Sequence, residues 1–458
     1  MVIAISISIG LAIAGPQEAP RRIPSDSEAG GQSLGWLSLE EAVQRAREAN
    51  PALLAQRAAA RADAQAPLEA SKAFLPTLRL GVSGVRTVDP VAVFGLKLRQ
   101  GAFDAGDLAL DALNRPAAHS GFTSTATVEV PLLVPAGIFG YRAAGKSAEA
   151  GAAAAERAAG ATEFVVTQAY WDAQLAAASL LALDEALASV EAHAKEAEAL
   201  QAQGLVTGLD ARLARLGVAE VEARRIGAAA TADNARAGLL ALLGLPDEAP
   251  LVLTDSLTEL RASGCGEPEA CPLSERADLR ARRFGVDAAA LGVRSAWARN
   301  LPSVAAFGSL SRHGASTPWT SGSGDWTIGI GLSWSPFDAL SGVGAVRKAR
   351  AEREAAEALL VDAERRAELE AAQARRSLQA AAERVSVATA AWAEAQEALA
   401  QARTRYRTGV APISELLDVQ AATTATRLLL LTAQRDHAVA SAALDFAHGD
   451  FDHGAFER

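Results

Sequence analysis

The chain has 458 residues, of which 50% are hydrophobic and 5% aromatic, and its formal net charge is -10. Nucleic-acid-binding proteins present a basic face to the phosphate backbone, so the acidic balance argues against a nucleic-acid partner. Two cysteines are too few for a disulfide scaffold or for a four-cysteine zinc site.

The N-terminus has the pattern of an export signal. Residues 2–14 form an apolar run that ends in Ala-Ile-Ala, the small-x-small form of a signal-peptidase site, so we predict a signal peptide at 1–14. The run is too short to cross a bilayer as a helix. It lacks the usual preceding positive charge, because the first arginine is Arg21, and a buried N-terminal strand is the alternative. Residues 15–36, rich in Pro, Ser and Gly, are predicted to be a linker.

After the linker, one order of elements occurs twice: helix, strand, long loop, strand, very long helix, tight turn, helix. The matching residues are separated by 226 positions before the loop and by 205 after it, which places one insertion in the first loop. The matching pairs are Pro76 with Pro302, Pro131 with Pro336, and Gly204 with Gly409. We therefore predict the following organisation: a first repeat at 37–250, an inter-repeat loop at 251–273, a second repeat at 274–447 and a tail at 448–458.

The predicted helices are long and rich in Ala, Glu, Arg and Leu. Ser38 and Glu41 have the spacing of a capping box at the start of the first helix. A helix of about sixty residues is roughly 90 Å long, which indicates coiled-coil packing. A soluble helical bundle is the alternative. The predicted ranges are 38–74, 140–200, 209–243, 274–299, 342–406 and 412–447.

The predicted strands alternate apolar and polar residues. In the fourth strand the apolar face carries a tryptophan at each end, Trp326 and Trp334, as in a lipid-facing strand with aromatic girdles. A soluble sandwich would also alternate. Outside the N-terminus no uncharged apolar run reaches eighteen residues, so a membrane crossing would need strands closed into a barrel. The apolar positions are Leu78, Leu80, Val82, Ala126, Val128, Val130, Val304, Ala306, Leu310, Trp326, Ile328, Ile330, Leu332 and Trp334.

Over residues 37–448 the chain resembles the TolC family of outer-membrane efflux proteins. The tandem repeat, the two β-hairpins and the two tip turns at 204–210 and 409–418 carry this resemblance. It implies an α+β membrane protein with an internal tandem repeat. Antiparallel coiled-coil helices would form an α-barrel, and four β-strands per chain would contribute to a shared twelve-stranded barrel of a homotrimer. The Gly-Gly pair that often follows the strand-end proline in this family is absent after Pro131 and Pro336.

The resemblance also implies a function and partners. The protein would lie in the outer membrane of a Gram-negative bacterium, in contact with its lipid, and its helical tunnel would lie in the periplasm. It would be the passive exit duct of a tripartite efflux or type I secretion system, with a periplasmic adaptor protein and an inner-membrane pump as partners. Drugs, metal ions and proteins all remain possible cargo. The alternative function is a non-transport periplasmic coiled-coil scaffold.

Four residues near the tips are implied by the resemblance to close the duct. Glu415 and Asp418 lie three positions apart and share a helix face, so three chains would form an acidic selectivity ring. The alternative is two solvated acids favoured by the helix dipole. Asp210 and Tyr406 match a hydrogen-bonded gate latch. The alternatives are helix capping for Asp210 and packing for Tyr406.

The tip turns themselves are the expected adaptor-docking sites. Glycine permits the tight turn and the aliphatic side chains next to it are expected to be exposed; turn chemistry alone is the alternative. The basic residue that the family carries two positions after the second tip glycine is absent, because Ala411 stands there. The docking residues are Gly204, Leu205, Val206, Gly409 and Val410.

The remaining motifs favour no chemistry. Cys265 and Cys271 would form a local disulfide in the oxidising periplasm. The glycines of 342–344 lack the third glycine of a dinucleotide-binding loop, so we expect no cofactor. The His- and Asp-containing tail at 448–453 is more consistent with a solvated end than with a metal site. No catalytic set is present, and we expect a protein that is not an enzyme.

Overall fold

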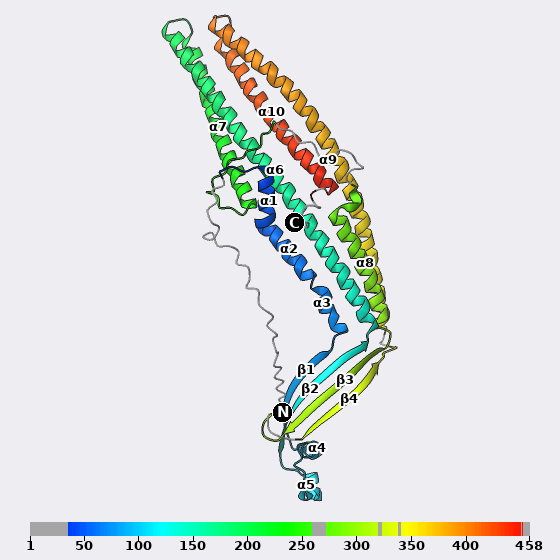
Figure 1. Cartoon of the computed structure of the whole chain (residues 1–458). Helices are drawn as coiled ribbons and strands as arrows, with labels where there is room; N and C mark the ends of the chain where they lie inside the picture. Colours follow the sequence, from blue (N-terminus) through cyan, green and yellow to red (C-terminus); the bar gives the residue numbers. More distant parts are fainter. Residues whose placement is uncertain (1–34, 259–271, 319–322, 338–339, 450, 452–458) are drawn as a thin grey trace. The chain divides into compact units, whose positions relative to one another are not determined.

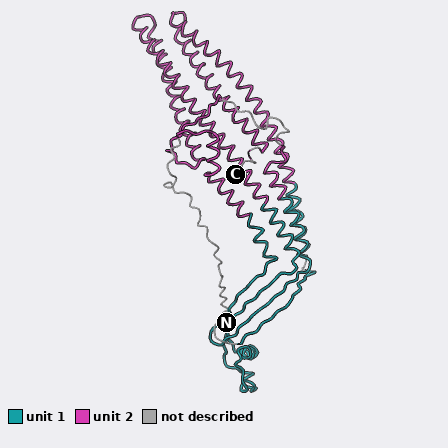
Figure 2. Tube along the Cα trace, in the orientation of Figure 1, with its two compact units in different colours: residues 1–29, 64–148, 285–357 teal, residues 30–63, 149–284, 358–458 magenta. Residues whose placement is uncertain are grey.

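The computed structural model describes residues 35–258, 272–318, 323–337, 340–449 and 451. These residues form two compact units (Figure 2). Unit 1 contains 64–148 and 285–357; unit 2 contains the rest of the described chain. The predicted signal peptide and the predicted Cys265–Cys271 disulfide lie outside the described residues.

Unit 1 contains a four-stranded antiparallel sheet in the order β1-β2-β3-β4 (Figure 1). The register aligns the predicted apolar positions across all strands: Leu80 pairs with Ala126, Ala126 with Leu310, and Leu310 with Trp326. Because side chains directly opposite each other lie on the same face, the four alternating patterns form one apolar surface. The strands are β1 (Thr77–Thr87), β2 (His119–Leu133), β3 (Ser303–Gly314) and β4 (Gly324–Ser333).

The second strand continues past the proline that was expected to close it. Pro131 has no N–H for a ladder hydrogen bond. It lies beyond Glu129, the last residue of β2 that pairs with β1, and next to a register shift against β3. The strand therefore tolerates Pro131 and ends at Leu133.

The long first loop contains two short α-helices, α4 (Pro90–Gln100) and α5 (Leu110–Asn114), and the 3-10 helix η2 (Ala105–Leu108). Asp89 caps α4 by accepting a hydrogen bond of 2.7 Å from the N–H of Ala92. The Gln100 amide donates to the carbonyls of Ser120 at 3.0 Å and of Gly314 at 3.3 Å. The end of α4 is thereby attached to β2 and β3.

The predicted helix 38–74 is interrupted. It forms α1 (Leu39–Ala49), α2 (Pro51–Asp63) and α3 (Ala66–Ala70), followed by the 3-10 helix η1 (Ser71–Ala73). Asn50 adopts an extended backbone with ψ 119°, because the ring of the following proline disfavours the helical conformation. The predicted capping box is present: the N–H of Ser38 donates to Glu41 and the N–H of Glu41 to the Ser38 hydroxyl.

The other predicted helices occur within a few residues of their predicted ends. Within the described residues one of them, α6, includes a stretch long and apolar enough to cross a membrane, of which 33% is buried. This is weak support for a crossing, since core helices of soluble proteins have the same property. The helices are α6 (Pro135–Ala202), α7 (Gly208–Leu242), α8 (Ala277–Ala298), α9 (Ser341–Arg407) and α10 (Ile413–His448), and the 3-10 helix η3 (Leu273–Glu275) precedes α8.

The core of unit 2 surrounds Tyr170 on α6. This side chain is fully buried and packs with Leu37, Leu239 and Leu431, which lie next to α1, on α7 and on α10. Its hydroxyl lies 2.8 Å from a carboxylate oxygen of Asp255 and 3.0 Å from the Leu37 carbonyl. This phenol therefore helps to tie Asp255 to the start of α1, together with a direct hydrogen bond of 2.6 Å from the N–H of Leu39 to Asp255.

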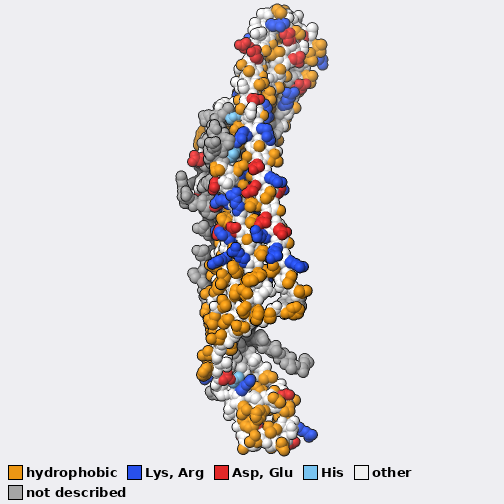
Figure 3. All heavy atoms as spheres, turned by 90° about the vertical axis from the view of Figure 1, so that its right-hand side faces the viewer, with side chains coloured by type: hydrophobic (Ala, Val, Ile, Leu, Met, Phe, Trp, Pro, Cys, Tyr) orange, Lys and Arg blue, Asp and Glu red, His pale blue; other side chains and the backbone are white. Residues whose placement is uncertain are grey.

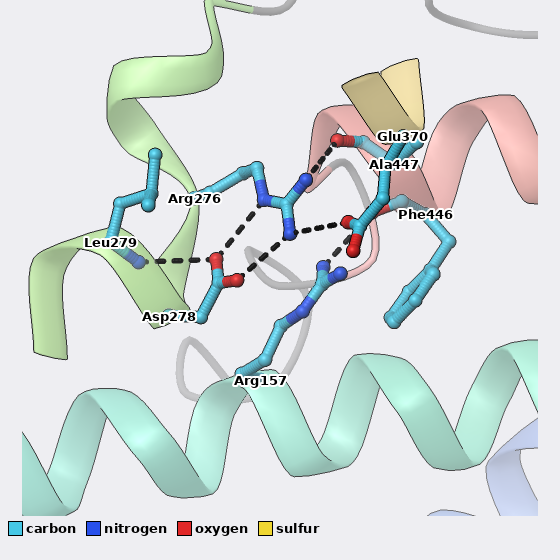
Figure 4. Close-up of polar contacts among 7 residues, drawn as sticks. All are labelled: Arg157, Arg276, Asp278, Leu279, Glu370, Phe446 and Ala447. Carbon is cyan, nitrogen blue, oxygen red and sulfur yellow. Dashed lines mark hydrogen bonds and ion pairs between the residues drawn. The ribbon is translucent and has the colours of Figure 1, made fainter. Parts of the chain in front are cut away.

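A buried arginine joins helices that are far apart in the sequence (Figure 4). Arg276, only 3% exposed at its side chain, makes two hydrogen bonds to Asp278, of 2.8 and 3.0 Å. It also donates to Glu370 on α9 at 3.0 Å and to the carbonyl of Ala447 on α10 at 2.9 Å. Burial raises the pKa of Asp278, but the hydrogen bonds and charge of Arg276 outweigh it and hold the pKa below its usual range.

A second arginine completes the end of α10. Arg157 on α6 donates to the Phe446 carbonyl at 2.9 Å, and its guanidinium carbon lies 3.6 Å from the centre of the Phe446 ring. Arg157 and Arg276 thus bind two carbonyls in the last turn of α10, where backbone partners are scarce. The Phe446 carbonyl also accepts from the N–H of Gly449, the C-cap, at 3.1 Å.

Candidate functional site

The sheet presents a large apolar surface to its surroundings. The alternate residues of β4 are the most exposed: Trp326 is 72% exposed, Ile328 76% and Ile330 72%. On the face of the molecule in Figure 3, hydrophobic side chains dominate the surface around the strands and their junctions with the helices, and charged side chains gather over the long helices. An exposed apolar surface of this kind marks a membrane or protein contact.

The sheet is also open at both edges. Among the described strands β1 pairs only with β2, and β4 pairs only with β3. Each edge strand therefore has backbone N–H and C=O groups available to another strand. A single chain leaves both the apolar face and the two edges without cover in the described structure.

The opposite face is mostly small and polar, but it also carries Val85 on β1 and Phe307 on β3. Phe307 on β3 faces this side, and its ring covers Gly329 on β4: a Cβ at Gly329 would lie 2.7 Å from the ring. Phe122 covers Gly84 in the same way at 2.9 Å, on the apolar face. Sequence alternation did not indicate these contacts, because a ring lying over a glycine depends on which residues the register places opposite each other.

A polar cluster lies on the polar face of β2, β3 and β4. The buried ring of His313 is 3.1 Å from the Thr123 hydroxyl through Nδ1 and 2.8 Å from the Asp325 carboxylate through Nε2. The three side chains come from three adjacent strands and fix their alignment. The sequence carried no signal for this cluster beyond the alternation that places all three residues on one face.

Both tip turns use a left-handed glycine. Gly204 has φ 73° and Gly409 has φ 74°, and neither would meet another atom within 4 Å if it carried a Cβ. The predicted aliphatic residues next to them are largely exposed: Leu205 is 67% exposed and Val410 69%, and Val206 is half-buried.

At the first tip, the acid caps its own helix. Thr207 is the N-cap of α7, and Asp210 is the third residue of the helix. The Oδ2 atom of Asp210 accepts from the Thr207 N–H at 2.9 Å and from the Thr207 hydroxyl at 2.7 Å. The N–H of Asp210 donates to that hydroxyl at 3.3 Å, which completes a capping box.

At the second tip, the equivalent acid contacts the other helix of the hairpin, α9. Glu415 is the third residue of α10, but its N-cap is Pro412, which makes no side-chain hydrogen bond. The Glu415 carboxylate instead lies 3.0 Å from the guanidinium of Arg405 on α9. Asp418 is exposed and makes no hydrogen bond or ion pair within the described residues. The two predicted ring acids therefore have different surroundings.

Tyr406 lies in an apolar cluster between the two hairpins. Its side chain is 5% exposed and packs with residues such as Ala197 on α6 and Ile413 on α10. Its hydroxyl has no hydrogen-bond partner in the described part of the chain. Burial raises the pKa of Tyr406, and the negative charges of Glu196 and Asp210 raise it further. Asp210 is thus close enough to act on Tyr406 electrostatically, but the predicted latch hydrogen bond is not formed in this single chain.

Two further arginines, which sequence reasoning missed, connect the hairpins. Arg403 donates to the Ser189 hydroxyl on α6 at 2.7 Å, and Arg407 pairs with Glu196 on α6 at 3.2 Å. Beside them, burial lowers the pKa of His193, and the positive charge of Arg403 lowers it further. The sequence places Arg403 and Arg407 four positions apart, on one face of α9, and this spacing could have indicated that both contact the same neighbouring helix.

The described residues offer no candidate metal site. Among them, no three or more His, Cys, Asp or Glu side chains lie close enough to hold a metal ion. The chemistry that the tips offer is charge, hydrogen bonding and exposed apolar surface.

Comparison with known proteins identifies the fold. Residues 272–450, which include α8, β3, β4, α9 and α10, match the family model of the outer membrane efflux protein. No curated protein matches the sequence.

Solved structures are similar over nearly the whole chain. A membrane protein from Pseudomonas aeruginosa has a TM-score of 0.77 and 22% identity, covering 90% of this chain and 92% of that chain. The outer membrane protein VceC from Vibrio cholerae has a TM-score of 0.73 and 21% identity, covering 90% and 96%. The outer membrane channel MtrE from Neisseria gonorrhoeae, in its open state, has a TM-score of 0.72 and 18% identity, covering 92% and 90%.

The resemblance to the TolC family is therefore confirmed: the chain carries an outer membrane efflux protein domain at residues 272–450 and has the fold of the outer-membrane channels.

Proposed function

We propose that three copies of this chain form a passive exit duct in the outer membrane of a Gram-negative bacterium, with the long helices in the periplasm. The family match to outer membrane efflux proteins supports the efflux role. The protein would bind no cofactor and would catalyse no reaction. It would provide the outer-membrane step for cargo that an inner-membrane pump and a periplasmic adaptor deliver.

The observation that carries this proposal is the open, apolar sheet. Burying a lipid-facing side chain such as Ile328, now 76% exposed, contributes about 1.5–3 kcal/mol. A sheet edge cannot face hydrocarbon, however, because each unsatisfied backbone group costs several kcal/mol there. Lipid contact is therefore compatible with this sheet only if β1 and β4 find strand partners.

Other copies of the chain are the partners that fit both edges. The described residues of one chain supply four strands, and membrane barrels have eight or more. If β1 of each chain pairs with β4 of the next, three chains close a twelve-stranded barrel with the apolar face outside. The mostly polar face, with Thr123, Asp325 and His313, then lines the lumen.

The test is the mass of the particle extracted by detergent from the outer-membrane fraction, corrected for bound detergent. We expect three chains in one stable particle. A soluble monomer that is absent from membranes would contradict the duct and favour a periplasmic coiled-coil scaffold.

The tips would close the duct toward the periplasm. In a trimer the exposed carboxylate of Asp418 and that of Glu415 would each occur three times around one constriction. Acidic rings attract cations and repel anions, so the closed tip would act as a selectivity ring. The solvated-acid alternative predicts that Asp418→Asn leaves ion selectivity unchanged.

The Tyr406–Asp210 latch would form as the tips close. The Tyr406 hydroxyl is buried without a partner in the described chain, and the capping box uses only Oδ2 of Asp210. A hydrogen bond from the phenol to the other carboxylate oxygen would contribute roughly 1.5–3 kcal/mol if shielded from water.

The latch is tested by the ionic conductance of the closed pore in planar bilayers. We expect Tyr406→Phe to increase this conductance, because it removes the donor and keeps the ring packing. An unchanged conductance in a correctly assembled trimer would refute the latch.

The exposed aliphatic residues at the tips would bind the adaptor. A crosslinker placed at Val206 or Val410 should capture the adaptor, which is identified by its mass. The same crosslinker at Leu216, 55% exposed on α7 but away from the turn, is the matched control. Equal capture from Leu216 would refute specific docking at the tips.

A further inference from the structure

The ion pair between Arg405 and Glu415 changes the charge of the tip. The guanidinium Nη1 of Arg405 lies 3.0 Å from Oε1 of Glu415, and the two side chains are 54% and 35% exposed. They come from opposite arms of the second hairpin, α9 and α10. The carboxylate thus has a cation within contact distance in its own chain.

The local backbone keeps this arginine at the turn. The carbonyl of Arg405 accepts hydrogen bonds from the N–H of Val410 at 2.9 Å and of Ala411 at 3.2 Å. The hydroxyl of Thr408 donates to the same carbonyl at 3.1 Å. Since three donors hold its carbonyl, the side chain of Arg405 starts from a fixed position facing the first turn of α10.

The sequence of the turn leaves Glu415 available for this pairing. A residue at the third position of a helix normally reaches back to the N–H of the N-cap. Pro412 has no N–H and no hydroxyl, so it offers Glu415 no such bond. The carboxylate of Glu415 instead forms an ion pair with Arg405.

The two neighbouring arginines of α9 bind residues other than Glu415 and Asp418. Arg407 pairs with Glu196 at 3.2 Å, and Arg403 donates to Ser189 at 2.7 Å. Asp418 makes no ion pair in the described structure. The group of Arg405, Glu415 and Asp418 therefore has a net charge of -1, where the two acids alone would have -2.

We propose that Arg405 is a specificity-determining residue of the duct: it neutralises Glu415 in each chain and leaves Asp418 as the acid that attracts cations. This inference rests on the proposed trimeric duct and deepens its acidic ring. Three unpaired acids, rather than six, then face the ions at the constriction.

The test is ion selectivity, measured as the reversal potential of the purified trimer in planar bilayers across a KCl gradient. The variants are Arg405→Gln, Glu415→Gln, Asp418→Asn and the double variant Arg405→Gln/Glu415→Gln. Each is first shown by mass to remain a trimer.

Arg405→Gln frees Glu415, so the ratio of cation to anion permeability should rise about twofold or more, as expected for a unit charge roughly 8 Å from the ion in water. Glu415→Gln and Asp418→Asn should each lower the ratio. The double variant removes one charge of each sign and should return to the wild-type value.

Arg384→Gln is the matched control. Arg384 is an exposed arginine on the same helix, 3.4 Å from Asp436 and twenty-one positions before Arg405. The substitution Arg384→Gln changes the net charge by the same amount as Arg405→Gln, but away from the tip. It should therefore leave the permeability ratio unchanged.

The possible failures are distinguishable. If wild type is cation-selective but Arg405→Gln is identical to it, or if the double variant matches Glu415→Gln alone, the inference is wrong and the duct stands. If Asp418→Asn has no effect, Asp418 is not the selecting acid. A wild-type chain that forms no conducting trimer would overturn both the duct and the inference.

Discussion

The two tips, at 204–210 and 409–415, begin with the same backbone and use their acids differently. In each, a left-handed glycine is followed six residues later by an acid at the third position of the next helix. At the first tip a threonine N-cap holds the acid in a capping box. At the second tip a proline N-cap does not, and the acid pairs with Arg405.

This difference shows that the N-cap residue determines which partner the carboxylate of the following helical turn binds. Thr207 offers a hydroxyl and an N–H to Asp210, so that the carboxylate stays on its own helix. Pro412 offers neither, so that the carboxylate of Glu415 reaches a cation on the other helix. The first acid thus stabilises a helix end, and the second sets the charge available at the tip.

The largest expected effect concerns what the tips share. Gly204→Ala and Gly409→Ala should each cost about 1–2 kcal/mol, because alanine is strained at positive φ. No neighbouring atom would clash, so the cost is that of the backbone alone. Hydrogen exchange of the amides in the adjoining helix turns would measure it as lost protection. Equal losses would show that both turns depend on their glycine to the same degree, and a loss at only one tip would show that the two turns differ.

The next largest effect concerns the difference between the N-cap of α7 and the N-cap of α10. Thr207→Ala removes the capping box and should lower the local stability of α7 by about 1 kcal/mol. Pro412→Ala is the matched change at the second tip and removes no side-chain hydrogen bond, so the loss of protection in α10 should be smaller. The same exchange experiment reports both. A larger loss in α10 than in α7 would contradict the assigned roles.

A smaller effect should follow from transplanting the first cap to the second tip. Pro412→Thr supplies a hydroxyl and an N–H to Glu415, and we expect it to stabilise the start of α10 by about 0.5 kcal/mol, at the low end of capping energies. The gain is limited because the acid leaves Arg405, and an exposed ion pair contributes about 0.2–1 kcal/mol. If protection of α10 falls instead, the acid prefers its ion pair to the cap.

The smallest effect is a pH dependence that His193, on the α6 arm of the first hairpin, should give to the tips. The pKa of His193 is lowered by burial and by Arg403, so opening of the tip favours proton uptake. Packing at the tips should therefore be fully stable above a pH of about 6.5 and weaken as the pH falls from there toward the lowered pKa. Exchange at pH 7.5 and 5.5, corrected for intrinsic rates, measures this change. His193→Gln should remove it; persistence of the change would assign it to another group.

Much of the fold could be predicted from the sequence because it depends on local order. The helix ranges, the alternating strand faces and the tip glycines follow from periods of 3.6 and 2 and from turn chemistry. The same reasoning placed Asp210 and Glu415 on first helical turns. It missed the interruption at Asn50 and Pro51, although a residue before proline disfavours a helix. It also did not foresee the helices α4 and α5 inside the first loop.

Which residues lie on which face of each helix and strand follows from the amino-acid sequence alone, because that property belongs to a short segment. Which partner each face meets depends on the tertiary fold. Arg405 and Glu415, Phe307 and Gly329, and Arg276 with Glu370 lie on different elements, so their pairing depends on register and helix packing. A carboxylate that the sequence predicts to be unpaired can therefore be neutralised by a residue that lies close to it only in the folded hairpin.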